Sequence, residues 1–172
     1  MNIPLAMACV LAVGVITPPT SAQSKPASCQ APELRQFDFW VGRWNVFDAA
    51  DKKVGENVIE SIDSGCVLLE RWRGNGGFTG SSLNSWSAVT KQWHQHWVDN
   101  QGGLLRLSGA FEGGRMVLAA SEPDPKKPGS LLCQRITWTA LPDGSVRQLW
   151  ERSAGGGAAW TTVFDGRYAR QH

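Results

Sequence analysis

A short segment rich in histidine and tryptophan carries several residues that could bind a metal or a small molecule. The side chains of an extended strand alternate between its two faces, so Trp93, Gln95 and Trp97 share one face, and His94 and His96 share the other. Two indoles are harder to leave in water than two imidazoles, and we therefore expect the tryptophan face to point inward. Gln95 would then be a buried amide that needs a partner, which could be another side chain, a water molecule or a ligand.

The spacing of His94 and His96 is one that some zinc sites use. Even an open catalytic zinc site has three protein ligands, and the one other histidine is His172, at the end of the chain. We therefore expect no metal site and interpret the two histidines as a solvent-facing polar pair.

A second segment places an acid on the same strand face as an indole, because Leu68, Glu70 and Trp72 alternate with their neighbours. If that face points inward, Glu70 is a buried carboxyl group, which must be paired or protonated. Arg135 and Arg147, in later segments, are possible partners. An internal pair of this kind could orient a polar ligand group or act as an acid or base, and a purely structural ion pair is the alternative.

A late segment repeats the combination of an amide and an indole on one face, since Gln148 and Trp150 are spaced as Gln95 and Trp97 are. Two such faces would give an aromatic cavity with a few fixed hydrogen-bonding groups, which is the composition of small-molecule pockets. The expected ligand contacts are the walls Trp72, Trp93, Trp97 and Trp150 and the orienting groups Glu70, Gln95, Arg135 and Gln148. Alternatively, the tryptophans fill the interior solidly.

The elements that position these residues are short strands, because alternating segments recur between turn signals and no segment has a sustained helical stripe. Glycine-rich turns such as Asn75-Gly76-Gly77 suit hairpins. Strands are expected near 43–49, 54–62, 66–73, 79–88, 91–99, 103–111, 115–121, 131–140, 145–153 and 159–169. About ten such strands favour an all-β, antiparallel up-and-down β-barrel, because closure removes exposed sheet edges; a β-sandwich is the alternative.

The first 22 residues differ from the rest of the chain. Residues 1–22 contain an apolar run, a Pro-Pro break and small residues suited to cleavage, as in a secretory signal peptide. The apolar run is shorter than the roughly 20 residues that cross a bilayer, so no membrane span is expected. We predict a polar N-terminal tether over 23–36, a single barrel domain over 37–170, and a periplasmic or secreted location.

Three cysteines follow the predicted cleavage site, in a compartment that would permit disulfides. Cys133 lies in an apolar strand pattern and is expected to be a buried thiol. Cys29 and Cys66 lie outside strands or at their edges, which makes them the better pair.

Charge and composition narrow the classes of partner. The 17 Lys and Arg and 15 Asp and Glu are interspersed, with a net charge of +2, so we expect no nucleic-acid partner. The nine tryptophans suggest a broad aromatic core, a lined cavity, or both.

Several motifs resemble those of a known family. The stretches FDFWVGRW, KQWHQHWVDN, RITWT, GSVRQLWERS and WTTVFDGRY are together similar to a family of mostly exported bacterial proteins of lipocalin-like (calycin) fold. The resemblance spans about Cys29 to Arg170, implies the fold and a Cys29–Cys66 bridge, and implies no activity.

A more distant similarity, through the early F…G-x-W element, is to fatty-acid-binding-type barrels and to nitrobindin, a haem-binding barrel. Haem binding of that kind would need a histidine on a late strand. The sequence has none between His96 and His172, so no haem cofactor is expected.

Taken together, these features predict an exported β-barrel that binds a small apolar or aromatic ligand in its interior. One alternative is a barrel enzyme, isomerase-like or cyclase-like, that uses Glu70 as an acid or base. Another is a structural barrel with a filled tryptophan core. The sequence leaves the oligomeric state and the identity of the ligand open.

Overall fold

The computed structural model describes residues 29–154, 156–157 and 159–171. The predicted signal peptide and residues 23–28 of the predicted tether lie outside the described residues. Within the described part of the chain, no helix is long and apolar enough to cross a membrane.

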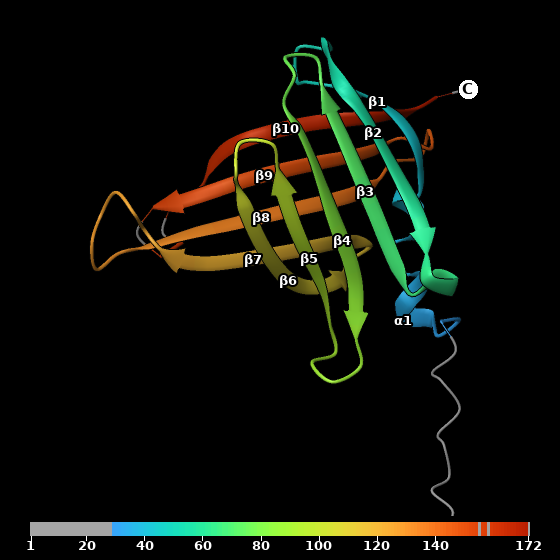
Figure 1. Cartoon of the computed structure of the whole chain (residues 1–172), viewed down its shortest axis with the longest axis horizontal. Helices are drawn as coiled ribbons and strands as arrows, with labels where there is room; N and C mark the ends of the chain where they lie inside the picture. The colour runs from blue at the N-terminus through green and yellow to red at the C-terminus, as the bar shows by residue number, and fades with distance from the viewer. Residues whose placement is uncertain (1–28, 155, 158, 172) are drawn as a thin grey trace, which may run out of the picture.

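Ten strands form one closed antiparallel sheet, in which each strand pairs with its neighbours in the sequence and the last pairs with the first (Figure 1). The elements are α1 (Pro32–Arg35), η1 (Asp38–Trp40), β1 (Gly42–Phe47), β2 (Lys53–Ile62), η2 (Asp63–Gly65), β3 (Val67–Gly74), β4 (Thr79–Ser87), β5 (Gln92–Asp99), β6 (Leu104–Glu112), β7 (Arg115–Pro123), β8 (Leu131–Ala140), β9 (Val146–Ala154) and β10 (Thr161–Arg170). This confirms the predicted all-β, ten-stranded antiparallel barrel and excludes the β-sandwich.

The strand boundaries lie within two residues of those expected from the sequence. Glycine-rich turns account for this agreement, because they take backbone conformations that other residues avoid. Gly77 has a φ of 82° between β3 and β4, and Gly102 has a φ of 80° between β5 and β6. Each strand therefore ends where the chain must reverse.

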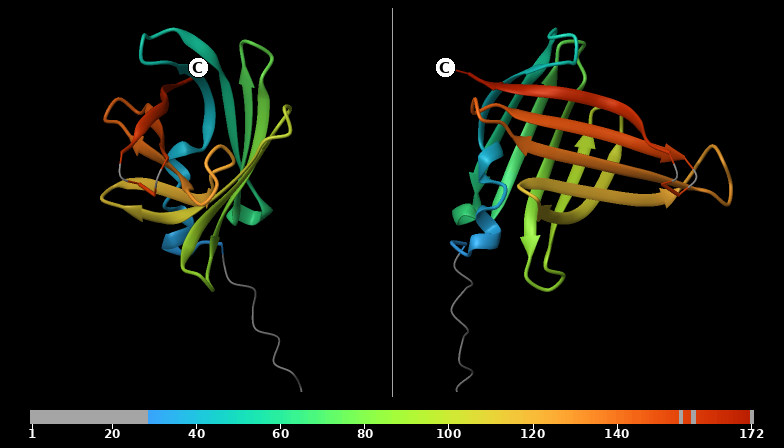
Figure 2. Two further views of the ribbon diagram at one scale, coloured as in Figure 1. Left: turned by 90° about the vertical axis from the view of Figure 1, so that its left-hand side faces the viewer. Right: turned by 180° about the vertical axis from the view of Figure 1, so that it is seen from behind.

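One end of the barrel is sealed by the segment that precedes β1, which lies beside the lower strand ends in Figure 2. Phe37 and Trp40 have no exposed surface, and their rings stack at 4.9 Å. The Phe37 ring also meets Trp93 of β5 at 5.6 Å and Trp138 of β8 at 5.2 Å. With Trp44, these five aromatic residues form a cluster that we call the sealed end.

The sealing segment is fastened to the barrel by a covalent bond and by polar contacts. A disulfide joins Cys29 to Cys66, which lies between η2 and β3, and their Cα atoms are 5.0 Å apart. Arg35 donates to the carbonyl of Gly65, and within the segment it pairs with Asp38 at 3.3 Å. The predicted Cys29–Cys66 bridge is thus confirmed. Cys133 is a buried free thiol, as expected.

Candidate ligand cavity

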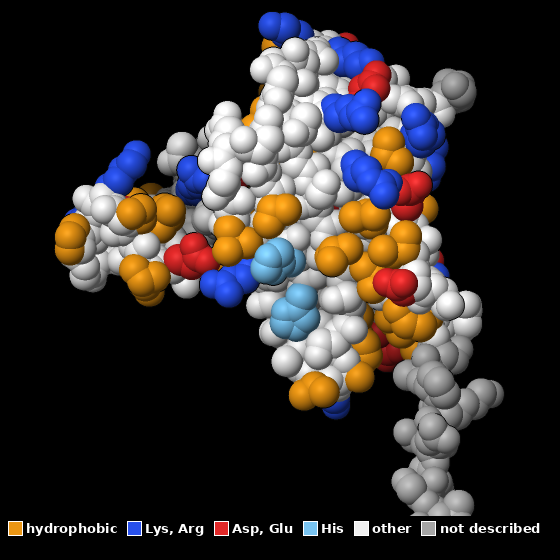
Figure 3. Space-filling view, in the orientation of Figure 1, with side chains coloured by type: hydrophobic (Ala, Val, Ile, Leu, Met, Phe, Trp, Pro, Cys, Tyr) orange, Lys and Arg blue, Asp and Glu red, His pale blue; other side chains and the backbone are white. Residues whose placement is uncertain are grey.

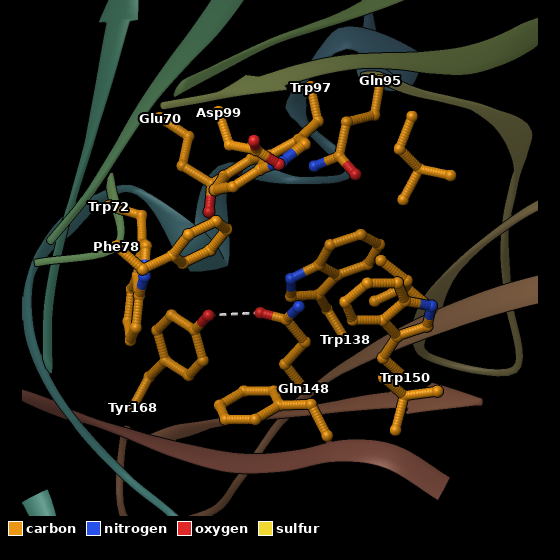
Figure 4. A pocket seen from close by; sticks show the side chains of 14 residues that line it. Glu70, Trp72, Phe78, Gln95, Trp97, Asp99, Trp138, Gln148, Trp150 and Tyr168 are labelled. Atoms are coloured by element: carbon orange, nitrogen blue, oxygen red, sulfur yellow. Dashed lines mark hydrogen bonds between the residues drawn. The ribbon is translucent and has the colours of Figure 1, made fainter. Parts of the chain in front are cut away.

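The end of the barrel opposite the sealed end holds a cavity of about 320 Å³ (Figure 4). We call this the open end; it lies near the turn between β3 and β4 and the turn between β5 and β6. Trp72 lines it from the end of β3, Trp97 from β5 and Trp150 from β9. Trp138, a member of the sealed end, also lines the cavity and so forms part of its floor.

Six of the eight residues expected to contact a ligand line this cavity. They are Glu70, Trp72, Gln95, Trp97, Gln148 and Trp150. They come from three strands, β3, β5 and β9, and converge because strand alternation sends every second side chain into the barrel. The structure therefore brings these six together, whereas their role in binding stays a prediction.

Trp93 does not line the cavity. It is only 1% exposed, packs edge-on against Phe37 at the sealed end, and donates its indole N–H to Oε1 of Gln36 at 3.2 Å. Trp93 faces inward like Trp97, but it lies at the opposite end of β5, where the sealing segment covers it. Its assignment as a cavity wall is wrong.

The placement of Arg135 inside the barrel is also wrong. On β8 the inward positions belong to Ile136 and Trp138, so Arg135 faces outward. There its guanidinium donates to Glu151 at 2.8 Å and lies 4.3 Å from the centre of the Trp160 ring.

Arg147 likewise lies on the outer surface and pairs with Asp165 at 2.7 Å. Neither of the arginines considered as a partner for Glu70 therefore contacts it. The internal Glu–Arg pair is replaced by hydrogen bonds to neutral side chains.

Several cavity residues were not expected from the sequence. They are Phe78, Asp99, Leu105, Ile136, Trp138, Val163, Phe164 and Tyr168. Asp99 shares the strand face of Gln95 and Trp97, so alternation could have indicated it. Phe78 lies in a turn, where no periodic signal applies.

Glu70 is the most buried acid of the cavity, with 5% of its surface exposed. Its Oε1 accepts a hydrogen bond from Nδ2 of Asn57 at 2.7 Å, and its Oε2 accepts one from Oγ of Ser82 at 2.6 Å. Burial raises the pKa of Glu70, and the hydrogen bonds from Ser82 and Asn57 partly oppose that rise. The interior of the barrel thus favours the protonated acid more than water does.

Ser82 has an orientation fixed by its neighbours. Its Oγ accepts from Nδ2 of Asn84 at 2.8 Å and from Nε2 of Gln95 at 3.4 Å. A hydroxyl has one hydrogen and two lone pairs, so two amide donors leave the hydrogen to point at Glu70. The polar network inside the barrel is therefore directed toward the Glu70 carboxyl group.

Tyr168 of β10 also lines the cavity and donates its hydroxyl hydrogen to Oε1 of Gln148 (Figure 4). Burial raises the pKa of Tyr168 well above its usual value, and the nearby charge of Glu70 adds to the rise. Tyr168 is therefore a neutral hydrogen-bonding group. Among the described residues, no hydrogen-bond partner contacts the indole N–H of Trp138 or of Trp150.

Two wall tryptophans lie directly against glycines of the neighbouring strand. A Cβ atom at Gly55 of β2 would come within 2.7 Å of the Trp72 ring, and one at Gly80 of β4 would clash with the Trp97 ring. The absence of a side chain at Gly55 and Gly80 lets the indoles lie flat on the wall. Space is thereby left at the centre of the barrel.

Asp99 lies at the open end and is held by backbone N–H groups. Its Oδ1 accepts from Gly103 at 2.8 Å and from Gln101 at 2.9 Å, and its Oδ2 accepts from the Trp97 indole at 3.3 Å. The hydrogen bond from Gly103 is the largest cause of a lowered pKa for Asp99. This carboxylate therefore stays ionised where the cavity meets solvent.

The two described histidines lie on the outer surface of the barrel, in pale blue in Figure 3. Nε2 of His94 is 2.9 Å from Oγ1 of Thr90. Within residues 29–154, 156–157 and 159–171, no group of three or more side chains could hold a metal ion. His172 lies outside the described residues, and the expectations of no zinc and no haem stay predictions.

Comparison with protein-family models gives no match, and comparison with curated proteins gives none either. The similarity to exported lipocalin-like proteins therefore rests on the sequence motifs. Function has to be argued from the cavity itself.

Proposed function

We propose that this protein is an exported, lipocalin-like barrel that binds a small aromatic or largely apolar molecule in its cavity. The observation that carries the proposal is the convergence of indoles and amides from non-adjacent strands on one space of about 320 Å³. That volume is at the lower end of the range of small-molecule pockets, roughly 300 to 1,000 Å³. A compact ligand of one to three rings fits this size.

The energetic argument for an apolar ligand lies in the walls. Trp72, Trp97 and Trp150 are only partly buried and present apolar surface to the cavity. A ligand that covers this surface gains roughly 25 cal/mol for each Å² of apolar area removed from water. Gln95 and Gln148 supply the few polar contacts that fix orientation.

Binding is tested with the apolar fluorophore N-phenyl-1-naphthylamine. Val163 lines the cavity and is 41% exposed, so Val163→Trp places a large ring at its opening. Val89 is 94% exposed in the turn between β4 and β5, near the sealed end, and Val89→Trp is the matched control. We expect saturable binding that weakens about tenfold in Val163→Trp, the loss of roughly 1.4 kcal/mol, and is unchanged in Val89→Trp.

Binding that is absent from the wild-type protein, or equally strong in both variants, would contradict the proposal. Native mass spectrometry of the protein purified from its own host then identifies a co-purifying ligand. Mass determination of the same sample tests export, since cleavage after Ala22 is expected to leave Gln23 as the first residue.

A barrel enzyme is a second candidate, favoured by the raised pKa of Glu70 within the cavity. A raised pKa keeps a carboxyl group protonated to higher pH, which suits a general acid. Loss of turnover in Glu70→Gln with ligand binding retained would favour the enzyme, and unchanged turnover would dismiss it.

A further inference from the structure

The ionisable side chains that line the cavity are acidic or neutral, and none is basic among the described residues. Two of them, Glu70 and Asp99, are acids, the third is the neutral Tyr168, and no Lys, Arg or His of the described residues lines the cavity. We propose that the ligand is a small organic cation, a protonated amine on an aromatic or apolar body, with its amine directed at Glu70. This inference rests on the proposed function and specifies its ligand class.

The first argument is that Glu70 has no cationic partner within the described chain. None of the six ion pairs of the described residues includes Glu70. The candidate arginines Arg135 and Arg147 pair with other acids on the outer surface of the barrel. A buried carboxylate is stable only when a positive charge or several donors compensate it. A ligand amine would supply the missing charge.

The second argument is that the surrounding groups are oriented for a carboxylate. Asn57 donates to one oxygen of Glu70 and Ser82 to the other, and the Ser82 hydrogen is forced toward Glu70 by Asn84 and Gln95. An ionised carboxyl group only accepts hydrogen bonds, whereas a protonated one must also place its own hydrogen, so a donor at each oxygen favours the carboxylate. Each carboxylate oxygen keeps a second lone pair for a ligand N–H.

The third argument concerns the walls. Seven aromatic rings line the cavity, from Trp72, Phe78, Trp97, Trp138, Trp150, Phe164 and Tyr168. Aromatic faces attract cations through the ring quadrupole, most strongly in tryptophan. An anionic ligand would instead face Glu70 and Asp99 without any compensating cation. Aromatic walls with acids favour an organic cation over an anion of the same shape.

The two acids differ in a way that suits the uptake of a cation. Asp99 is ionised at the open end, where it attracts positive charge, and Glu70 is the more buried of the two. The groups that face Glu70 from adjacent strands are Asn57 and Ser82, which do not titrate, and Tyr168 stays neutral. A bound cation favours ionised Glu70. Binding of the protonated amine is therefore expected to release the proton of Glu70, and the affinity for the amine is expected to rise with pH.

The test compares three probes that share one ring and differ in charge: 2-phenylethylamine, 2-phenylethanol and phenylacetate. By calorimetry at neutral pH, we expect the wild-type protein to bind the amine about tenfold more tightly than the alcohol and to bind phenylacetate least. Glu70→Gln is expected to remove the preference for the amine while it retains the alcohol. The matched control is Glu112→Gln, which removes the same charge from an exposed position on β6.

The outcomes separate the two proposals. If neither these probes nor N-phenyl-1-naphthylamine binds, the proposed function itself is wrong. If the alcohol or phenylacetate binds as tightly as the amine, the cavity binds ligands but the cation inference is overturned. A preference for the amine that persists in Glu70→Gln overturns the assignment to Glu70.

A measurement on the wild-type protein covers the case in which Glu70→Gln does not fold. The ratio of amine affinity to alcohol affinity is followed from about pH 4 to about pH 8, a range in which the amine stays protonated. We expect the ratio to rise with pH as Glu70 ionises. A constant ratio would show that Glu70 does not hold the amine.

Discussion

The two ends of this barrel use the same residue type in opposite ways. At the sealed end, Trp40, Trp44 and Trp93 are at most 1% exposed and contact other rings or the barrel wall. At the open end, Trp97 and Trp150 are only partly buried and line the cavity. The difference shows that a tryptophan on an inward strand face is part of the core where another segment covers that end of the barrel, and part of a cavity wall where none does.

The physical cause of the difference is the segment before β1. Phe37 enters the barrel at one end and fills the space between Trp40, Trp93 and Trp138. Among the described residues, no comparable segment enters at the other end, where Trp97 lies flat over Gly80 and leaves the centre open. The following experiments test this contrast.

The largest effect is expected from Phe37→Ala, which opens the sealed end. Removing a fully buried phenylalanine ring costs about 3–5 kcal/mol of unfolding free energy. Trp97→Ala, at the open end, should cost less because that side chain is only partly buried. Urea denaturation measures both, and equal losses would show that the two ends do not differ in packing.

The next effect is expected from the double variant Cys29→Ser, Cys66→Ser. The disulfide joins residues 37 positions apart, and removal of such a link costs about 2–4 kcal/mol by freeing the unfolded chain. Urea denaturation with and without reductant provides the measurement. Reductant should destabilise the wild type and have no effect on the variant; a wild type that is insensitive to reductant would contradict the stabilising role.

A smaller effect is expected from Gly80→Ala at the open end. The added methyl group would clash with the Trp97 ring, which must move toward the cavity, at a cost of about 1–3 kcal/mol. Gly76→Ala is the control, since a Cβ there meets nothing within 4 Å. Loss of N-phenyl-1-naphthylamine binding in Gly80→Ala alone would support the role of Gly80 in keeping the open end unfilled. Identical binding and stability of the two variants would contradict that role.

The smallest effect is the pH dependence that Glu70 gives to stability. Between the ordinary glutamate pKa and the raised pKa of folded Glu70, only the folded state holds the proton. Its contribution to the unfolding free energy is therefore complete below the ordinary pKa and falls as pH rises, by up to about 1.4 kcal/mol per pH unit. Denaturation at several pH values should show this slope in the wild type and its absence in Glu70→Gln. Parallel curves would contradict the raised pKa.

Strand alternation predicted much of the candidate site, and its failures have physical reasons. Gln95, Trp97 and Trp150 lie on the face that alternation assigned to the interior. Alternation fixes which face a side chain is on, but it does not fix height along the barrel axis. Trp93 and Trp97 share a face of β5 and lie at opposite ends of the barrel, which sequence spacing alone does not distinguish.

Arg135 shows a second kind of failure. Strand β8 has apolar residues at both parities, with Leu131 and Cys133 on the face of Arg135 and Ile136 and Trp138 on the other. The inward face of such a strand is decided by its neighbours in the sheet. Arg135 lies opposite Glu151 of β9 in the sheet, and this pairing shows that the charge of Arg135 is compensated on the outer surface of the barrel.

The sequence by itself determined the number of strands, their approximate boundaries and the reversals between them, because alternation and glycine turns act over a few residues. It also indicated that Glu70 would be a buried acid if its strand face pointed inward. Tertiary structure alone decided which end is filled by Phe37, which charges meet outside the barrel, and that Glu70 has Asn57 and Ser82 as partners. These depend on contacts between distant segments, and a closed sheet brings such segments together only when all of its strands are in place.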